Sequence, residues 1–139
     1  MTTLIDTSLW IAMYRDRTGA LAKNVRDASG PDEPQFARFV AMEILQGCSS
    51  DAEWNLIEDH HHDQSYVEAT SRTWHGAARI YFELRSKGVT VRSSIDCCIA
   101  QLAIENNLTL LHNDRDFEKI AQVRPLKHRR IDAEKVAQP

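Results

Sequence analysis

The stretch that decides the fold is LTLLHNDRDF, residues 108–117. Its first four residues, LTLL, form an apolar run typical of strands that are buried on both faces of a parallel sheet. Asp114 and Asp116 follow shortly after this run, on either side of an arginine. An aspartate in this place can cap a following helix or hold a metal ion, and the rest of the chain decides between the two.

Short extended segments alternate with helical segments along the rest of the chain. Extended segments are expected at 2–6, 35–40, 64–69, 89–92, 108–111 and 126–131. Helices are expected at 8–16, 18–28, 41–47, 51–59, 71–86, 94–106 and 115–122. This alternation predicts an α/β fold in which helices cover both faces of a mostly parallel sheet. We therefore expect a single three-layer α/β/α domain over residues 1–139.

The composition, with 42% hydrophobic and 27% charged residues, is that of an ordinary globular protein. No apolar run approaches the roughly 20 residues that span a bilayer, and no signal-peptide pattern is visible, so we expect a cytoplasmic protein with no membrane partner. Three cysteines, two of them adjacent, provide neither a disulfide framework nor a Cys-x-x-Cys zinc motif. A net charge of −3 does not favour nucleic-acid binding through bulk charge.

Carboxylates recur where the expected extended segments end and the next helices begin. They are Asp6, Glu43, Asp96 and Asp114. Because ligands of open parallel sheets bind outside the carboxyl ends of the strands, all four are expected at one edge of the sheet.

Each carboxylate also has a purely structural explanation. Asp6 and Asp114 can cap helices, and Glu43 is a favourable acid near a helix N-terminus. Ser93 and Asp96 match a capping box in which Asp replaces the commoner Glu. Four such coincidences at one edge of a sheet are nevertheless less probable than one shared site.

Clustered carboxylates raise one another's pKa values, and a divalent cation relieves their repulsion. Oxygen ligands suit Mg²⁺ or Mn²⁺ rather than zinc, and such ions promote hydrolysis of phosphodiester bonds. The chain has no Gly-x-x-x-x-Gly-Lys loop and no Gly-x-Gly-x-x-Gly motif, so nucleotide cofactors are not supported. The residues alone therefore favour a metal-dependent phosphodiesterase.

Four motifs spread over the chain resemble those of the PIN-domain ribonucleases, in particular the VapC-type toxins of bacterial type II toxin–antitoxin systems. They are LIDTS (4–8), MEILQG (42–47), IDCCIAQLAIENN (95–107) and LLHNDRDFEKIA (110–121). The resemblance implies a Mg²⁺-dependent endoribonuclease, in which Mn²⁺ can substitute, that cleaves RNA with an activated water and leaves a 5′-phosphate.

The resemblance also implies roles for individual residues. Asp6 and Asp96 match direct metal ligands, and Glu43 and Asp114 match acids that hold the metal directly or through water. Supporting roles, as a fifth acid or as hydrogen-bonding partners of the site, are expected for Asp116, Thr7, Ser8 and Asn113.

The resemblance further implies partners: an RNA substrate, a second copy of the chain in a homodimer, and a VapB-type antitoxin whose tail lies across the groove. Arg92 and Arg115 flank the expected groove, where they are either contacts to RNA phosphates or plain surface charge. His112 is not expected to be a general base. The run His60–His62 is expected at a surface helix end, because adjacent histidines on a helix do not converge on one ion.

Two other functions are compatible with part of the pattern. A PIN scaffold that binds RNA or protein without cutting it would be expected to lack some of the acids, and all four are present. A phosphatase of the haloacid dehalogenase class would need Asp-x-Asp after the first strand, where this chain has Asp6-Thr7-Ser8.

Overall fold

The sheet is built around β4 (Thr109–His112) in the computed structural model, which describes residues 2–133. β4 pairs in parallel with β1 (Thr3–Ile5) on one side and with β5 (His128–Arg130) on the other. The ends of the expected domain, residue 1 and residues 134–139, lie outside the described residues.

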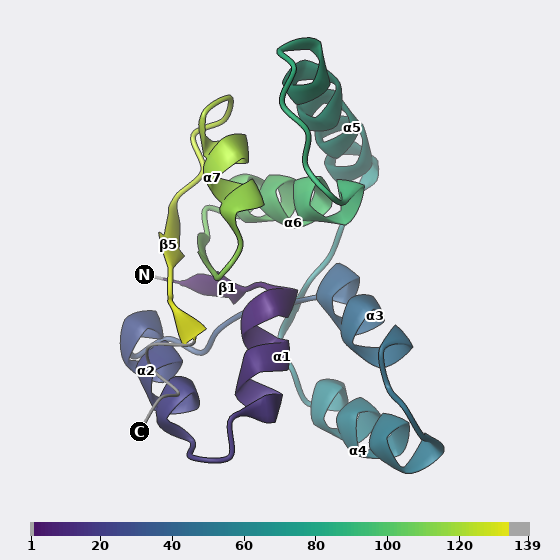
Figure 1. The fold of residues 1–139 in the computed structure, drawn as a ribbon, viewed down its shortest axis with the longest axis vertical. Coiled ribbons are helices and arrows are strands. Elements are labelled where there is room, and N and C mark those ends of the chain that lie inside the picture. Colours follow the sequence, from purple (N-terminus) through teal and green to yellow (C-terminus); the bar gives the residue numbers. More distant parts are fainter. Residues whose placement is uncertain (1, 134–139) are drawn as a thin grey trace.

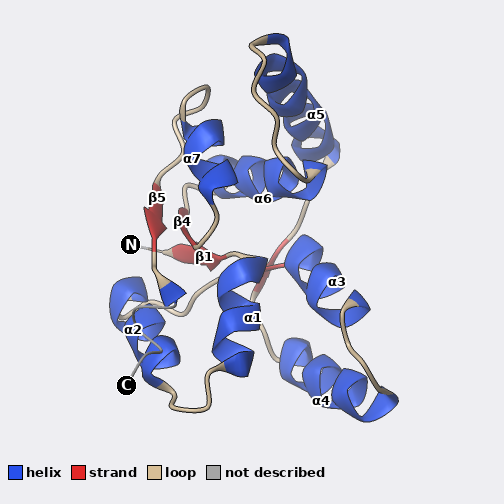
Figure 2. Cartoon of the chain, viewed as in Figure 1, coloured by secondary structure: helices blue, strands red, loops and turns tan. Residues whose placement is uncertain are grey.

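Two more strands form a second, two-stranded sheet next to β1. β2 (Phe36–Ala37) pairs in parallel with β3 (Tyr66–Val67), and an isolated bridge between Leu4 and Gln35, the residue before β2, links the two sheets. Every strand pairing among the described residues is parallel, which confirms the expected mostly parallel sheet. Figure 2 shows the short strands β1, β4 and β5 close together, with helices around them.

Helices occupy most of the remaining described chain. They are α1 (Thr7–Arg15), α2 (Ala20–Ser29), α3 (Arg38–Gln46), α4 (Asp51–His62), α5 (Ser71–Ser86), α6 (Ser94–Glu105) and α7 (Arg115–Ala121). Within residues 2–133, none of these helices has the length and apolar character that crossing a membrane requires.

Alternate residues of β1 and β4 bury against different helices and so create two cores. Leu4 and Leu110, which face each other in the pairing, belong to a core with side chains of α3, α5, α6 and α7. Ile5 and Leu111, one residue further along, belong to a second core with α1 and α2. Figure 1 shows α6 and α7 on one side of β1 and α1 and α2 on the other. The three-layer α/β/α architecture is therefore confirmed.

The expected extended segment at 35–40 is wrong in its second half, because α3 already begins at Arg38. Phe39 and Val40 are neighbours in sequence and both join the same core. A helix allows this, whereas consecutive residues of a strand point to opposite faces. Glu43 consequently lies in the second turn of α3 rather than in its first turn.

The extended segment at 89–92 forms no strand in the part of the chain that the structure describes. Its backbone is hydrogen-bonded to side chains of α7 instead of to a neighbouring strand. The Arg92 N–H donates to Asp116 Oδ2 at 2.9 Å, and the Lys119 ammonium donates to the Thr90 carbonyl at 3.1 Å. The segment still leads directly into α6 and so brings Asp96 to the edge of the sheet.

The histidine run forms the end of α4 as expected, and His60 and His62 are exposed there. His61 departs from the expectation, because it is only 3% exposed and its ring lies 4.7 Å from that of Phe36. His60 shares a 2.6 Å hydrogen bond with the Tyr14 hydroxyl of α1. These rings therefore help to pack α4 against α1 and β2.

Replacing Leu110 by Ala should lower the free energy of unfolding by about 2–5 kcal/mol, because this side chain is fully buried at the centre of the sheet. Urea denaturation followed by circular dichroism measures the change. The matched control is Leu56→Ala on α4, where the leucine is 73% exposed and its truncation should have little effect. Equal losses in the two variants would contradict the assignment of the core.

Candidate metal centre

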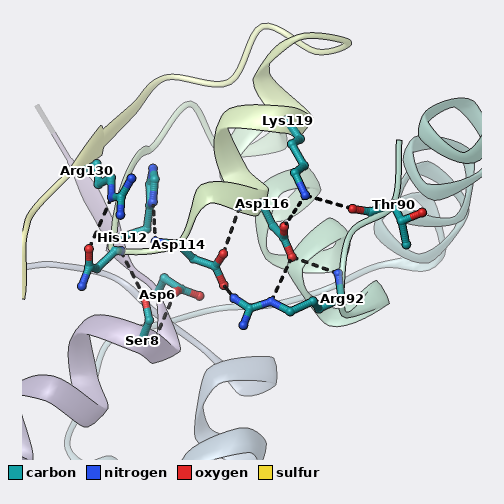
Figure 3. Close-up of polar contacts among 10 residues, drawn as sticks. Asp6, Ser8, Thr90, Arg92, His112, Asp114, Asp116, Lys119 and Arg130 are labelled. Atoms are coloured by element: carbon teal, nitrogen blue, oxygen red, sulfur yellow. Dashed lines mark hydrogen bonds and ion pairs between the residues drawn. The ribbon is translucent and has the colours of Figure 1, made fainter. Parts of the chain in front are cut away.

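One cavity at the carboxyl ends of β1 and β4 is lined by all four carboxylates that the sequence singled out. They are Asp6, Glu43, Asp96 and Asp114, and the lining also includes Thr7, Ser8, Ile11, Arg92 and Ser93. The acids come from four segments: the β1–α1 junction, α3, the first turn of α6 and the β4–α7 junction. Figure 3 shows the Asp114 carboxylate between Asp6 and the guanidinium of Arg92.

Asp6 uses one carboxylate oxygen as a helix cap and leaves the other without a partner. Its Oδ2 accepts hydrogen bonds from the backbone N–H and the hydroxyl of Ser8, at 3.0 and 2.6 Å. Its Oδ1 is buried and has no hydrogen-bond partner among the described residues. Burial raises the pKa of Asp6 to about 6, against the opposing effect of the Ser8 hydrogen bonds.

Asp96 is not used in the capping box that its spacing from Ser93 suggests. The Ser93 hydroxyl accepts from the N–H of Ile95 at 3.1 Å, and no described residue donates a hydrogen bond to the Asp96 carboxylate. Burial, followed by repulsion from Asp6 and Asp114, raises the pKa of Asp96 to about 8. This carboxylate is thus buried, surrounded by negative charge and uncompensated.

Asp114 is held from three directions. Its Oδ1 accepts from the Asp116 N–H at 2.9 Å, and its Oδ2 accepts from Arg92 Nη2 at 2.8 Å. Its own N–H donates to Nδ1 of His112 at 3.2 Å, while Nε2 of His112 shares a 2.9 Å hydrogen bond with Nδ1 of His128. Burial, and then the neighbouring His128, lowers the pKa of His112 to about 4. His112 is therefore a neutral acceptor that orients Asp114.

Hydroxyl groups of α1 connect the remaining elements of the site. The Thr7 hydroxyl donates to Oε1 of Glu43 at 2.7 Å and so ties α3 to α1. The Ser8 hydroxyl also accepts from the Asn113 N–H at 3.2 Å, which ties α1 to the end of β4. The Asn113 side chain lies within 3.4 Å of Arg130 Nε, and no described contact joins it to the Asp114 carboxylate.

Asp116 clusters with two of the four acids, although only a supporting role was expected for it. Oxygens of Asp96, Asp114 and Asp116 all lie within 4.8 Å of one another. Burial opposes ionisation of Asp116, yet the Arg92 N–H and Lys119, at 3.2 Å, hold its pKa below the usual value. Lys119 was not identified from the sequence, although its i,i+3 spacing from Asp116 is a signal for such a pair.

The donor set fits a hard divalent cation such as Mg²⁺ or Mn²⁺. The buried Asp6 Oδ1 without a partner and the uncompensated Asp96 both require positive charge nearby. All candidate ligand atoms are carboxylate oxygens, which these ions prefer. Arg115 is exposed and has no contact with the acids in the described part of the chain.

The metal-free protein should lose stability as the pH rises from about 4 to about 8. Asp96 has a pKa of about 8 in the folded protein against an ordinary value of 3.8, so the folded state binds the extra proton within this window. In EDTA, Asp96→Asn should therefore raise the free energy of unfolding at pH 8–9 by an amount on the order of a few kcal/mol. This gain should disappear below about pH 4.

Urea denaturation at several pH values measures this difference. The control is Asp27→Asn, which removes one charge from an exposed position of α2. A constant difference between Asp96→Asn and the original protein from pH 4 to pH 9 would be inconsistent with a buried, uncompensated Asp96.

Comparison with known proteins agrees with this geometry. The PIN domain family matches residues 3–123. Ribonuclease VapC11 of Mycobacterium tuberculosis (strain ATCC 25618 / H37Rv) is 34% identical over 127 residues, which cover 89% of this chain and 95% of that protein.

Among solved structures, VapBC2 from Rickettsia felis, bound to a DNA fragment of its promoter, has a TM-score of 0.78 at 18% identity and covers 95% of this chain and 100% of its own. VapBC-1 from nontypeable Haemophilus influenzae has a TM-score of 0.73 at 16% identity, with 94% and 98% covered. At this identity the solved structures establish the shared fold. The family match and the VapC relative show that the chain belongs to the PIN-domain family and, within it, to the VapC ribonucleases.

Proposed function

We propose that the acidic cavity is the metal centre at which this chain hydrolyses RNA phosphodiester bonds. As a VapC ribonuclease, the chain is the endoribonuclease toxin of a type II toxin–antitoxin system. The observation that carries the site assignment is the convergence of four carboxylates from four segments, one of which keeps a buried oxygen without a partner. Because RNA is the substrate, we place the enzyme in the cytoplasm.

In this proposal Asp6 and Asp96 bind Mg²⁺ directly, because they carry the oxygens that lack compensating contacts. Asp114 and Glu43 complete the site directly or through water, and Mn²⁺ can replace Mg²⁺. A Mg²⁺ ion held by these carboxylates would supply polarisation of a phosphoryl oxygen and a more nucleophilic water. The carboxylates fix the position of that chemistry at the edge of the sheet.

The chain's own hydrogen bonds keep the proposed ligands in place. Ser8 orients Asp6, Thr7 orients Glu43, and the N–H of Asp116 orients Asp114. Such fixed outer contacts matter because metal ligands work only in a restricted geometry. At the rim, Arg92 and Arg115 are the proposed contacts to RNA phosphates.

Two protein partners follow from the family. Solved relatives are VapBC complexes, and we propose that a VapB-type antitoxin binds this chain and covers its acidic cavity. We also propose a homodimer, since α5 exposes Trp74 and Phe82 at 56% and 48%. Light scattering after size-exclusion chromatography of the antitoxin-free chain tests the dimer.

Asp96→Asn should reduce RNA cleavage by at least about a hundredfold, because it removes a proposed metal ligand and a negative charge that stabilises the bound cation. The assay incubates antitoxin-free protein with total cellular RNA and Mg²⁺ or Mn²⁺, and maps the ends of the fragments. EDTA should abolish cleavage in the same way. Asp27→Asn, far from the cavity in sequence and exposed on α2, is the control that should keep full activity.

Undiminished cleavage by both Asp96→Asn and Asp6→Asn would exclude this metal centre. Metal-independent RNA binding without cleavage of any RNA tested would favour the alternative, a PIN-fold module that binds RNA or protein without cutting.

A further inference from the structure

The Arg92 side chain occupies one side of the acidic cavity. Its Nη2 lies 2.8 Å from Asp114 Oδ2, and its Nε lies 3.5 Å from Asp116 Oδ2 (Figure 3). Its backbone N–H also donates to Asp116, so the main chain is anchored while the side chain remains 79% exposed. The guanidinium is therefore attached to the site by ion pairs that can exchange.

This contact engages the Asp114 oxygen that takes no part in the helix cap. Its other oxygen, Oδ1, already caps α7 by accepting from the Asp116 N–H. Because Oδ2 takes no part in the helix cap, it is the oxygen that we expect a cation shared by Asp96 and Asp114 to approach, and it is the atom that the guanidinium contacts. Arg92 and a divalent cation thus compete for the same carboxylate oxygen.

We propose that Arg92 is an internal counter-cation of the site. Its guanidinium pairs with Asp114 when no divalent cation is bound, gives up Oδ2 when the cation arrives, and then binds a phosphate of the RNA at the rim. This inference rests on the proposed nuclease function and adds a positioning role that is coupled to metal binding.

The strength and shape of the interaction favour such an exchange. Exposed ion pairs contribute little stability, so a divalent cation can displace the guanidinium at small cost. Once released, a guanidinium offers two parallel N–H donors, which match phosphate oxygens better than an ammonium does. The anchored backbone keeps the released side chain beside the cavity.

Lys119, the other cationic side chain that contacts these acids, does not share this role. Its ammonium lies 3.2 Å from Asp116 Oδ1 and also donates to the Thr90 carbonyl. No described contact joins it to Asp114. Lys119 therefore fixes the segment 89–92 in place, whereas Arg92 is the described cation that contacts a proposed metal ligand of the cavity.

The first test measures Mn²⁺ binding to the full chain by calorimetry, without RNA or antitoxin. Arg92→Gln should bind Mn²⁺ about two- to fivefold more tightly, the equivalent of losing one exposed ion pair that competes for Asp114. Arg115→Gln is the matched control, because it removes a positive charge next to Asp114 in sequence without removing a contact to the acids in the described structure. It should leave the Kd for Mn²⁺ close to that of the original protein.

The second test measures cleavage kinetics at saturating Mn²⁺. Arg92→Gln should raise KM for RNA severalfold with a smaller effect on kcat, and Arg92→Lys should restore part of the loss. A residue that only maintained the structure would weaken Mn²⁺ binding and RNA binding together. The proposal instead requires that Arg92→Gln bind Mn²⁺ more tightly and RNA more weakly, with an unchanged melting temperature.

Each result bears on one part of the proposal. Unchanged or weaker Mn²⁺ binding in Arg92→Gln overturns the competition, and an unchanged KM overturns the transfer to phosphate. Absence of Mn²⁺ binding to the original protein, by contrast, contradicts the proposed metal centre itself. Failure of the inference and failure of the proposed function are therefore distinguishable.

Discussion

Repulsion between buried carboxylates is the constraint on which the rest of the site depends. Asp6 and Asp96 are both nearly inaccessible to water, and burial is the main cause that raises the pKa of each carboxyl. Negative charge adds to the effect, from Glu43 at Asp6 and chiefly from Asp6 and Asp114 at Asp96. Such an arrangement is unfavourable for an isolated folded chain, because buried charges need compensation. Hydrophobic burial in the two cores is the favourable contribution that offsets this cost in the folded chain. A cation bound at the proposed site would remove the cost.

Helix capping by Asp6 and Asp114 does not exclude the proposed metal binding. A carboxylate has two oxygens, and a cap needs only one of them. Asp6 gives Oδ2 to Ser8 and Asp114 gives Oδ1 to Asp116, which leaves one oxygen of each on the side of the cavity. The cap fixes the orientation of the second oxygen, so the local rule that begins the helix also positions the ligand. This answers the question that the stretch 108–117 raises.

The sequence was informative where local rules determine the structure. Strand β4 and the acids that follow β1 and β4 could be predicted, because an apolar run and a capping residue are adjacent in sequence. The segment 89–92 could not be, since its backbone partners are the side chains of Asp116 and Lys119, more than twenty residues away. The early start of α3 and the burial of His61 likewise depend on tertiary packing. The periodicity of apolar residues reports local structure and does not encode contacts between residues that are distant in sequence.

The charges of the site are compensated on one side only, and this asymmetry has a functional consequence. Asp114 and Asp116 contact Arg92 and Lys119, while Asp6 and Asp96 contact no cationic side chain in the described structure. An incoming divalent cation therefore gains most from Asp6 and Asp96, where no existing ion pair has to be broken. Engagement of Asp114 through Oδ2 would come at the expense of its ion pair with Arg92. The order of these contacts would couple complete metal binding to the release of an arginine at the rim, where the RNA backbone arrives.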